Sequence, residues 1–340
     1  MKRILVTGGA GFIGCNFVGY LLKKYKGYKI IVLDALTYAG SINNFSDEIK
    51  NNKNFVFWQG NVMNGEIVNE LVQESDVVVH MAAESHVARS IYDNRVFFET
   101  DVIGTQVVAN AVAHNKVERF IHISSSEVYG TAETDPMTED HPLNPMSPYA
   151  AAKVGADRLV YSYFKTYDIP AVMIRPFNNY GPYQHLEKVI PRFITSALTD
   201  RPLTVHGEGR SSRDWLNVND HCRALDAFIH CDIEKVKGEV FNIGTGRDIS
   251  VGEIAEMVLD ILGKPKSLIT HVEDRQGQVT RHISSVDKVR DKLGYRPEVE
   301  FEKGLEDTIR WYSDNRDWWE RLVWMKSIPM RLVGGEKVIY

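Results

Sequence analysis

A glycine-rich turn near the N-terminus limits the possible folds of this chain more than any other feature. It follows the apolar run Arg3–Thr7, and residues Phe12–Tyr25 after it have helical periodicity. Within the turn, Gly9, Gly11 and Gly14 fit the pattern G-x-G-x-x-G. Glycines at this spacing let the backbone approach a pyrophosphate, whose charge is stabilised by the N-terminus of the following helix. The chain therefore begins with the first unit of a predicted dinucleotide-binding fold.

The second predicted strand supplies the acidic residue that completes this pattern. Residues Ile30–Leu33 form a short apolar run, and Asp34 ends it about twenty residues beyond the glycines. A carboxylate at this place accepts hydrogen bonds from both hydroxyls of a ribose, and it would repel a 2′-phosphate. We therefore expect the cofactor to be NAD rather than NADP.

Predicted strands and helices continue to alternate through the first half of the chain. Strands are predicted at Phe55–Gln59, Val77–His80, Phe120–Ile123 and Ala171–Ile174, and helices at Gly65–Gln73, Phe97–Ala113 and Pro148–Tyr167. Apolar strands separated by helices indicate a parallel sheet covered on both faces, which is a doubly wound α/β (Rossmann) fold. Ligands of such sheets bind beyond the carboxyl ends of the strands. This rule places four segments on one rim: Gly8–Gly14, Ala82–Glu84, Ser124–Glu127 and Arg175–Asn178.

The chain is long enough for a second lobe. Single cores rarely grow beyond about 250–300 residues, and this chain has 340. Pro and Gly interrupt the pattern after Arg175. We predict an NAD-binding domain of residues 1–176, to which residues 218–245 return. Residues 177–217 and 246–340 are predicted to form a smaller α/β substrate-binding lobe, with helices at Val251–Leu262 and Ser284–Leu293.

Composition restricts the partners and the compartment. A formal net charge of −5 gives no electrostatic case for nucleic acid or an anionic membrane as the main partner. The three cysteines, Cys15, Cys222 and Cys231, are widely spaced and lack a metal-ligand pattern. We therefore expect a reduced protein with no disulfide and no bound metal. The chain starts with a strand-like run and contains no apolar stretch near the length of a membrane span, so we predict a cytoplasmic protein.

The chain from Ile121 to Lys153 carries the side chains best suited to chemistry. One predicted strand ends in Ser124–Glu127, and Tyr149 and Lys153 follow on one face of a helix. A lysine ammonium and a nicotinamide cation nearby would lower the tyrosine pKa, so that Tyr149 could act as general base in the oxidation of an alcohol. Ser125 is the natural third member, a hydroxyl that binds the same alcohol. Glu127 remains as a carboxylate for a further step.

Together these segments resemble the extended short-chain dehydrogenase/reductases, and within them the nucleotide-sugar 4,6-dehydratase family, most closely its members that act on dTDP-glucose. The resemblance covers nearly the whole chain and rests on Gly8–Gly14, Asp34–Gly40, His80–Ser90, Glu127–Gly130, Tyr149 with Lys153, Asn178–Gln184 and Arg213–Leu216. It implies a tightly held NAD, a nucleotide-diphosphate sugar as substrate, and a homodimer formed through two helices of each subunit. Our candidates for these helices are Phe97–Ala113 and the helix of Tyr149.

The resemblance also implies the reaction. Tyr149 takes the proton of the sugar 4-hydroxyl while hydride leaves C4 for NAD. The new ketone acidifies C5, and Glu127 removes the C5 proton. Loss of water from C6 and return of the hydride to C6 give a 4-keto-6-deoxy sugar.

Three sets of site residues follow from this comparison, and none of them includes a metal ligand. The expected catalytic residues are Ser125, Ser126, Glu127, Tyr149 and Lys153. The expected cofactor-binding residues are Gly8, Gly11, Phe12, Ile13, Gly14, Asp34, Asn61, Val62, Ala82, Tyr149 and Lys153. The expected substrate-binding residues are Ser85, Asn178, Lys188, Val189, His206, Arg213 and Arg275.

Three positions depart from the family pattern. Dehydratases of the dTDP-glucose type carry Thr-Asp-Glu before Val-Tyr-Gly, whereas this chain has Ser125-Ser126-Glu127. Ser126 therefore stands in the place of the acid that protonates the departing 6-hydroxyl. A serine could position a water there, or the protonated Glu127 could perform both steps. His206 stands where the family has Tyr near the base, and Asn61 stands where it has Asp near the adenine.

These departures leave other activities open. A UDP-glucuronate decarboxylase would oxidise C4 and lose carbon dioxide without an acid at C6, and a basic residue such as Arg213 would reach the sugar carboxylate. A nucleotide-sugar C4 epimerase would not need Glu127. A catalytically silent NAD-binding protein is disfavoured, because the chain has Ser125, Tyr149 and Lys153.

Overall fold

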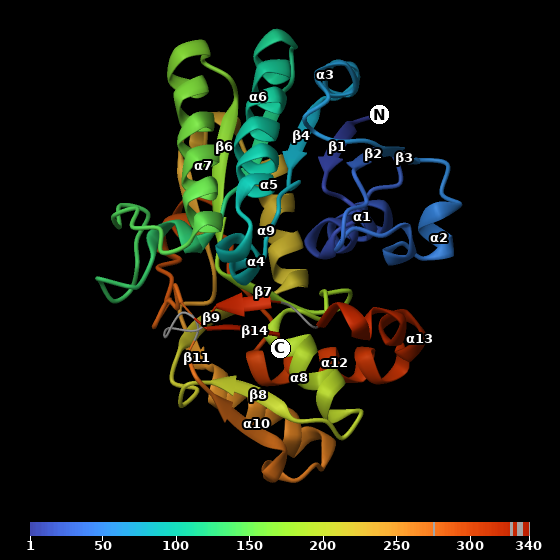
Figure 1. The fold of residues 1–340 in the computed structure, drawn as a ribbon. Helices are drawn as coiled ribbons and strands as arrows, with labels where there is room; N and C mark the ends of the chain where they lie inside the picture. The colour runs from blue at the N-terminus through green and yellow to red at the C-terminus, as the bar shows by residue number, and fades with distance from the viewer. Residues whose placement is uncertain (275, 327–328, 332–335, 340) are drawn as a thin grey trace.

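The computed structural model describes residues 1–274, 276–326, 329–331 and 336–339. A seven-stranded parallel sheet lies at its centre and confirms the predicted doubly wound fold (Figure 1). In spatial order the strands are β10 (Val240–Ile243), β6 (Ala171–Pro176), β5 (Arg119–Ile123), β4 (Val77–His80), β1 (Arg3–Thr7), β2 (Lys29–Asp34) and β3 (Phe55–Gln59). The order reverses between β1 and β4, which is where such sheets bind their ligands.

Helices cover both faces of this sheet, because successive strand residues point to opposite sides. Ile4 and Val6 of β1 belong to the core on one side, and Leu5 belongs to the core on the other. The first side is covered by α1 (Phe12–Lys24), α9 (Val218–His230) and α11 (Asp287–Leu293), and the second by α3 (Gly65–Gln73), α6 (Thr105–His114) and α7 (Pro148–Tyr167). Figure 1 shows α6 and α7 side by side.

The glycine turn between β1 and α1 has no room for side chains. Gly8 adopts φ +70°, and a Cβ atom added to it would lie 2.7 Å from the Cα atom of Ala82. A Cβ atom added to Gly14 would lie 2.6 Å from the Cα atom of Gly9. The turn therefore depends on glycine at both positions, of which only Gly14 belongs to the G-x-G-x-x-G pattern of the sequence.

Two predicted helices differ from the observed ones. The helix predicted at Phe97–Ala113 contains a π-helical turn, Phe98–Gly104, between α5 (Arg95–Phe97) and α6. This turn places the Asp101 carboxylate on the backbone N–H of Glu84 (2.8 Å). The helix predicted at Ser284–Leu293 begins only at Asp287. Ser284 instead forms an isolated bridge with Met137, and its backbone N–H and hydroxyl both donate to Asp214.

Short elements complete the first lobe. They are the helices α2 (Asp47–Lys50) and α4 (Val87–Tyr92), and the 3₁₀ helices Ile42–Asn44, Ser126–Tyr129 and Ile233–Lys235. The 3₁₀ helix Ser126–Tyr129 follows β5 directly, so it carries Glu127 away from the carboxyl end of that strand.

The second lobe contains short strands and four helices among the described residues, and Figure 1 shows it below the main sheet. Its elements are β7 (Asn178–Tyr180), α8 (Val189–Ala197), β8 (Leu203–His206), β9 (Ser212–Asn217), β11 (Asp248–Ser250), α10 (Val251–Leu262), a 3₁₀ helix (Lys266–Leu268), β12 (Ile269–Val272), α12 (Phe301–Asp314), α13 (Arg316–Trp319), a 3₁₀ helix (Glu320–Lys326), β13 (Pro329–Arg331) and β14 (Lys337–Ile339). Residues 218–245 supply α9 and β10 to the first lobe. The domain limits themselves stay a prediction.

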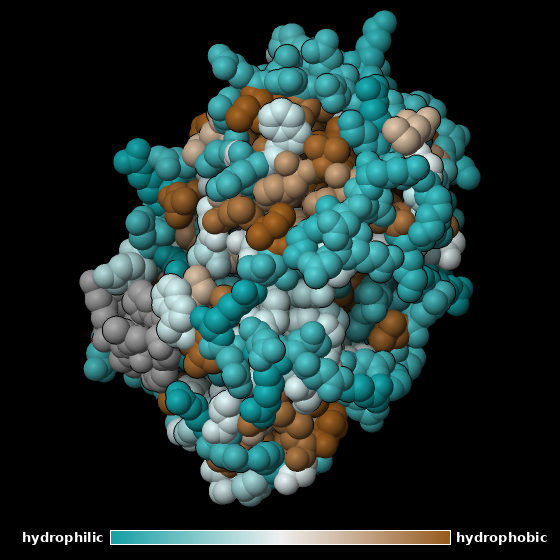
Figure 2. All heavy atoms as spheres, turned by 90° about the vertical axis from the view of Figure 1, so that its right-hand side faces the viewer, coloured by the Kyte–Doolittle hydropathy of each residue, from teal (hydrophilic) through white to brown (hydrophobic). Residues whose placement is uncertain are grey.

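One face of the molecule carries the open edge of the main sheet. Figure 2 shows this face, where apolar side chains gather in the upper part and hydrophilic side chains cover most of the rest. The edge strand β3 leaves Phe55, Val56 and Phe57 half-buried and Trp58 exposed. None of the helices described is both long and apolar enough to cross a bilayer.

Candidate active site

A cavity of about 380 Å³ lies between the two lobes, at the carboxyl ends of the sheet strands. Both lobes contribute to its lining. Of the residues predicted from the sequence, it is lined by Phe12, Ile13, Ser85, Ser125, Ser126, Glu127, Tyr149, Lys153, Asn178, Lys188, Val189, His206 and Arg213. All five predicted catalytic residues therefore share one cavity.

The remaining predicted cofactor residues lie outside this lining. They are Gly8, Gly11, Gly14 and Asp34 of the glycine turn and the end of β2, Asn61 and Val62 after β3, and Ala82 after β4. Each follows the carboxyl end of a strand, so the predicted cofactor site continues from the cavity along the edge of the sheet. Arg275 falls outside the described residues.

Asp34 and the glycine turn fit the adenosine end of NAD. The Asp34 carboxylate accepts hydrogen bonds from the backbone N–H groups of Ala10 (2.9 Å) and Leu36 (2.8 Å). Burial raises the pKa of Asp34, whereas these two hydrogen bonds lower it. Each carboxylate oxygen keeps a lone pair for a ribose hydroxyl.

Ser125, Tyr149 and Lys153 meet where β5 ends against α7. Burial raises the pKa of Tyr149, and its hydrogen bond with Ser125 lowers it. The Lys153 ammonium donates to the carbonyl oxygen of Ile123 (2.7 Å). Burial lowers the pKa of Lys153, whereas the negative charges of nearby carboxylates raise it. The two hydroxyls and the ammonium thus converge on one side of the cavity.

The electrostatic balance at Tyr149 differs from the sequence expectation. We expected Lys153 and a nicotinamide cation together to lower the tyrosine pKa. Of the protein's own contributions burial is the largest, and it raises this pKa. The negative charges of Asp101 and Glu127 raise the pKa further. A positive charge at the phenol is therefore needed to favour the phenolate.

Glu127 lies on the 3₁₀ helix after β5, next to a cation from the other lobe. Its backbone N–H donates to the Ser125 hydroxyl (3.2 Å), and its side chain is 16% exposed. Its Oε1 atom lies 4.0 Å from Nε of Arg213, on β9. The predicted base and a predicted substrate-binding residue are therefore neighbours.

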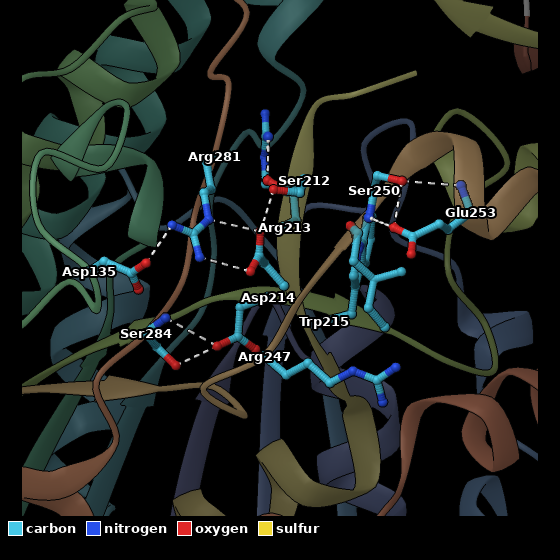
Figure 3. A network of polar contacts seen from close by, with 12 residues as sticks. Asp135, Ser212, Arg213, Asp214, Trp215, Arg247, Ser250, Glu253, Arg281 and Ser284 are labelled. Atoms are coloured by element: carbon cyan, nitrogen blue, oxygen red, sulfur yellow. Dashed lines mark hydrogen bonds and ion pairs between the residues drawn. The ribbon is translucent and has the colours of Figure 1, made fainter. Parts of the chain in front are cut away.

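A hydrogen-bond network holds β9, and Figure 3 shows it at close range. Asp214 is fully buried and accepts from the hydroxyls of Ser284 (2.5 Å) and Thr245 (2.7 Å) and from two backbone N–H groups of residues 245–246. Arg281 bridges Asp135 (2.7 Å) and Asp248 (3.0 Å). These contacts fix the strand that carries Arg213.

A buried cluster of charges lies beside the cavity and includes a residue that the sequence analysis missed. The Glu187 carboxylate is fully buried and accepts from Nε of Arg89 (3.0 Å). Its neighbour Lys188 donates to the carbonyl oxygen of Ser85 (2.6 Å). Burial and the charge of Glu187 raise the pKa of Glu84 to about 7. In the sequence Glu187 is marked only by its place beside Lys188. Lys188 was predicted to bind the substrate, and Glu187 was given no role.

One predicted rim residue points elsewhere. Arg175 is buried, and its guanidinium forms two hydrogen bonds of 3.0 Å with Asp157 of α7. The rim prediction was therefore wrong for this side chain, because a buried carboxylate needs a cation. The following residues, Pro176, Phe177 and Asn178, do line the cavity.

His206 lies at the end of β8 and lines the cavity, with Nδ1 3.0 Å from the carbonyl oxygen of Glu273. Asn178 is the first residue of β7. Further lining residues that the sequence analysis did not select are His86, Arg192, Thr204, Ser211, Trp215 and Gln278. Within the described chain there is no group of three or more side chains suited to hold a metal ion.

The parallel sheet, the glycine turn and the Ser125, Tyr149 and Lys153 set define an extended short-chain dehydrogenase/reductase. More narrowly, the chain belongs to the GDP-mannose 4,6 dehydratase family, which matches residues 5–308. A dTDP-glucose 4,6-dehydratase of Streptomyces niveus is 41% identical over 324 residues, which cover 94% of this chain and 95% of the relative.

Solved structures agree with this family. DesIV, a dTDP-glucose 4,6-dehydratase from Streptomyces venezuelae solved with NAD bound, has a TM-score of 0.91 and 41% identity, and the match covers 94% of this chain and all of DesIV. UDP-glucuronic acid 4-epimerase from Bacillus cereus has a TM-score of 0.87 and 31% identity, covering 92% of this chain and 99% of the epimerase. Because the fold is shared by a dehydratase and an epimerase, the side chains of the site must distinguish the reactions.

Proposed function

We propose that this chain is an NAD-dependent nucleotide-sugar 4,6-dehydratase of the dTDP-glucose type. The single observation that carries the proposal is the position of Glu127, which lines the same cavity as Ser125, Tyr149 and Lys153. A sugar alcohol that is oxidised beside Ser125, Tyr149 and Lys153 would have its neighbouring carbon atoms close to the Glu127 carboxylate. NAD, when bound, accepts the hydride of C4 and later returns it to C6.

Tyr149 is the proposed base for the sugar 4-hydroxyl. Its hydrogen bond with Ser125 holds the phenol oxygen toward the cavity, and Ser125 then shares the substrate alcohol. Lys153 supplies a positive charge at the same strand end, where it is fixed by the carbonyl oxygen of Ile123. Because burial disfavours the phenolate, the proton leaves Tyr149 most readily when cationic charge lies beside it.

Glu127 is the proposed base for C5. A ketone at C4 makes the C5 proton acidic, and a carboxylate in the cavity can remove it. The Arg213 guanidinium, 4.0 Å away, stabilises the carboxylate in its charged form. A C4 epimerase would have no use for a carboxylate at this place.

Residues of the second lobe are proposed to bind the nucleotide diphosphate. Asn178, Lys188, Val189, His206 and Arg213 line the lobe's side of the cavity and include three basic side chains. Arginine and lysine are the usual partners of phosphate oxygens. His206, at the end of β8, is the proposed contact of the base.

We also propose a homodimer in the cytoplasm. Three apolar side chains are exposed, Val96 on α5 and Phe98 and Ile103 on the π-helical turn. Apolar exposure of this kind is typical of an interface. Replacing Ile103 by Glu should shift the protein from dimer to monomer in sedimentation, whereas the same change at exposed Ile261, on α10 of the second lobe, should leave the dimer intact.

The test of the reaction is direct. The protein is incubated separately with dTDP-glucose, UDP-glucose, UDP-N-acetylglucosamine and UDP-glucuronate, and the masses of the products are measured by mass spectrometry. We expect at least one substrate to lose one water and form a 4-keto-6-deoxy sugar. Carbon dioxide from UDP-glucuronate would instead identify a decarboxylase, and a product of unchanged mass inverted at C4 would identify an epimerase.

A further inference from the structure

His282 lies under the 3₁₀ helix that carries Glu127 and touches both of its ends. Its ring is fully buried, and it packs edge-on against Phe177 with a centroid separation of 5.9 Å. Its Nδ1 atom lies 3.4 Å from the Ser126 hydroxyl, and its Nε2 atom lies 2.7 Å from the carbonyl oxygen of Gly130. The imidazole therefore connects the first residue of the 3₁₀ helix with the glycine that ends it.

The segment that carries His282 is held on both sides. Arg281 before it binds Asp135 and Asp248, and Ser284 after it binds Asp214 (Figure 3). The backbone N–H of His282 also donates to the carbonyl oxygen of residue 212 (3.1 Å). The ring consequently has one position relative to Ser126.

These contacts assign the proton positions. A carbonyl oxygen can only accept, so Nε2 of His282 must donate to Gly130. Burial lowers the pKa of His282 to about 4, so the ring is neutral near pH 7 and its Nδ1 atom is an acceptor. The Ser126 hydroxyl therefore donates its proton to Nδ1. Its lone pairs, and not its proton, remain available to the cavity.

Few other groups could protonate a departing hydroxyl. Among the described residues that line the cavity, the carboxylates are Glu127 and Glu187. Glu187 is held by Arg89, and although burial raises its pKa, the surrounding cationic and imidazole groups lower it overall. It remains charged and has no proton to give. Glu127, once it has taken the C5 proton, is the acid nearest to Ser126 in the chain.

We propose that His282 positions Ser126 as a hydrogen-bond acceptor, and that Glu127 alone carries the proton from C5 to the departing 6-hydroxyl. This inference rests on the proposed dehydratase function. It makes Ser126 a group that orients the 6-hydroxyl through its lone pairs, and His282 a positioning residue that acts through Ser126.

The step balances as follows. The C5–H bond breaks, its proton passes to the Glu127 carboxylate, and its electron pair forms the C5–C6 double bond while the C6–O bond breaks. The leaving oxygen takes the same proton from Glu127 and departs as water. Because the Glu127 carboxyl group both accepts the C5 proton and donates it to the oxygen on C6, the proton and the oxygen leave from the same face of the sugar. When hydride returns to C6, C5 takes a proton from solvent, and Tyr149 gives to solvent the proton that it took from the 4-hydroxyl, so the protons balance.

The first test separates the roles of the two neighbouring residues. Single turnovers are followed by absorbance of the reduced nicotinamide and by mass spectrometry of the product. Glu127→Gln should still reduce the bound cofactor but lose water elimination by about 10³-fold or more, whereas Ser126→Ala should lose about tenfold. A loss in Ser126→Ala as large as that in Glu127→Gln would overturn the proposal, because Ser126 would then be the acid.

Two variants of His282 form a matched pair. Asn places an amide oxygen near the position of Nδ1, so His282→Asn keeps the acceptor for Ser126. Gln places its amide near Nε2, so His282→Gln keeps the bond to Gly130 and loses the acceptor. We expect His282→Gln to slow elimination about as much as Ser126→Ala, and His282→Asn to recover most of the rate. Equal losses in both variants would contradict the positioning role.

The pH dependence gives a readout that a merely structural role would not move. The groups that face this ring are Glu127, Arg213 and His141. If His282 is neutral throughout, elimination in His282→Gln should be slower at every pH with an unchanged profile. A profile that loses a limb in this variant would show a titrating His282 and contradict the proposal. If the parent protein converts no nucleotide sugar, the dehydratase function itself fails, which is a different result.

Discussion

The two ends of the cavity are built in different ways. The oxidation end consists of Ser125, just after β5, and of Tyr149 and Lys153 on the adjoining helix α7. The elimination end consists of Ser126, Glu127, Arg213 and His282, and the last two come from the second lobe, as far as 156 residues from Ser126 in the chain. The first end therefore forms with the Rossmann domain alone, whereas the second needs both lobes to be packed together.

This difference indicates which part of the cavity determines the outcome of the reaction. Oxidation at C4 uses groups that belong to the fold, and the same fold serves an epimerase among the similar structures. Elimination, as proposed, also uses Arg213 and His282, which reach the cavity from the second lobe. Changes confined to one end should accordingly affect one half of the reaction, and the following variants test that separation.

The largest effect is expected from Tyr149→Phe. Loss of the phenol removes the base for the 4-hydroxyl, so cofactor reduction should fall by about 10³-fold, within the range known for general bases. Substrate affinity should change little, because the ring remains. Stopped-flow absorbance and titration calorimetry measure the two quantities. Retention of cofactor reduction would show that the oxidation end has been misplaced.

A smaller and more selective effect is expected from Asp214→Asn. This buried carboxylate accepts hydrogen bonds from Ser284 and Thr245 and holds the strand that carries Arg213. Loss of its charge weakens these bonds by about 1.5–3 kcal/mol in total, so the elimination end should loosen. We expect elimination to slow by about tenfold or more, while cofactor reduction is nearly kept. Equal loss of both half-reactions would remove the distinction between the two ends.

A shift in pH dependence is expected from Asp101→Asn. The negative charge of Asp101 raises the pKa of Tyr149, so its removal should lower that pKa. Burial raises the pKa of Asp101 itself to about 7, so the difference from the parent should appear mainly above pH 7, where Asp101 is charged. The pH profile of cofactor reduction should move toward lower pH. A move toward higher pH would contradict this electrostatic account.

The smallest effect is expected from Arg247→Ala. Its guanidinium pairs with Glu302 at 2.7 Å on the exposed surface of the second lobe. Exposed pairs contribute about 0–1 kcal/mol. Urea unfolding should therefore show a stability change within about 1 kcal/mol, and both half-reactions should keep their rates. A large change in elimination would mean that the second lobe transmits surface changes to the cavity.

The contrast between the two ends also explains what the sequence could predict. Ser125, Glu127, Tyr149 and Lys153 lie in one continuous segment, and the strand and helix that carry them have clear hydrophobic periodicity, so the cavity wall was predictable. Asp34 and the glycines were predictable because their spacing is fixed by the turn.

The rest depends on packing between distant parts of the chain. Neither the 4.0 Å approach of Arg213 to Glu127 nor the contact of His282 with Ser126 has a signature in local sequence. Lys153 and a nicotinamide cation were expected to lower the pKa of Tyr149, but the opposing effect of burial depends on the whole fold and has no signature in local sequence. Arg175 was placed on the rim, and its buried partner Asp157 could not be recognised from the helix pattern alone.

Glu127→Gln tests the central claim most directly. In a single turnover with dTDP-glucose, the sugar nucleotide that the proposed function favours, this variant should reduce the bound cofactor at a rate near that of the parent and form no product that has lost water. Formation of the 4-keto-6-deoxy sugar at the parent rate would contradict the account, because elimination would then not depend on Glu127.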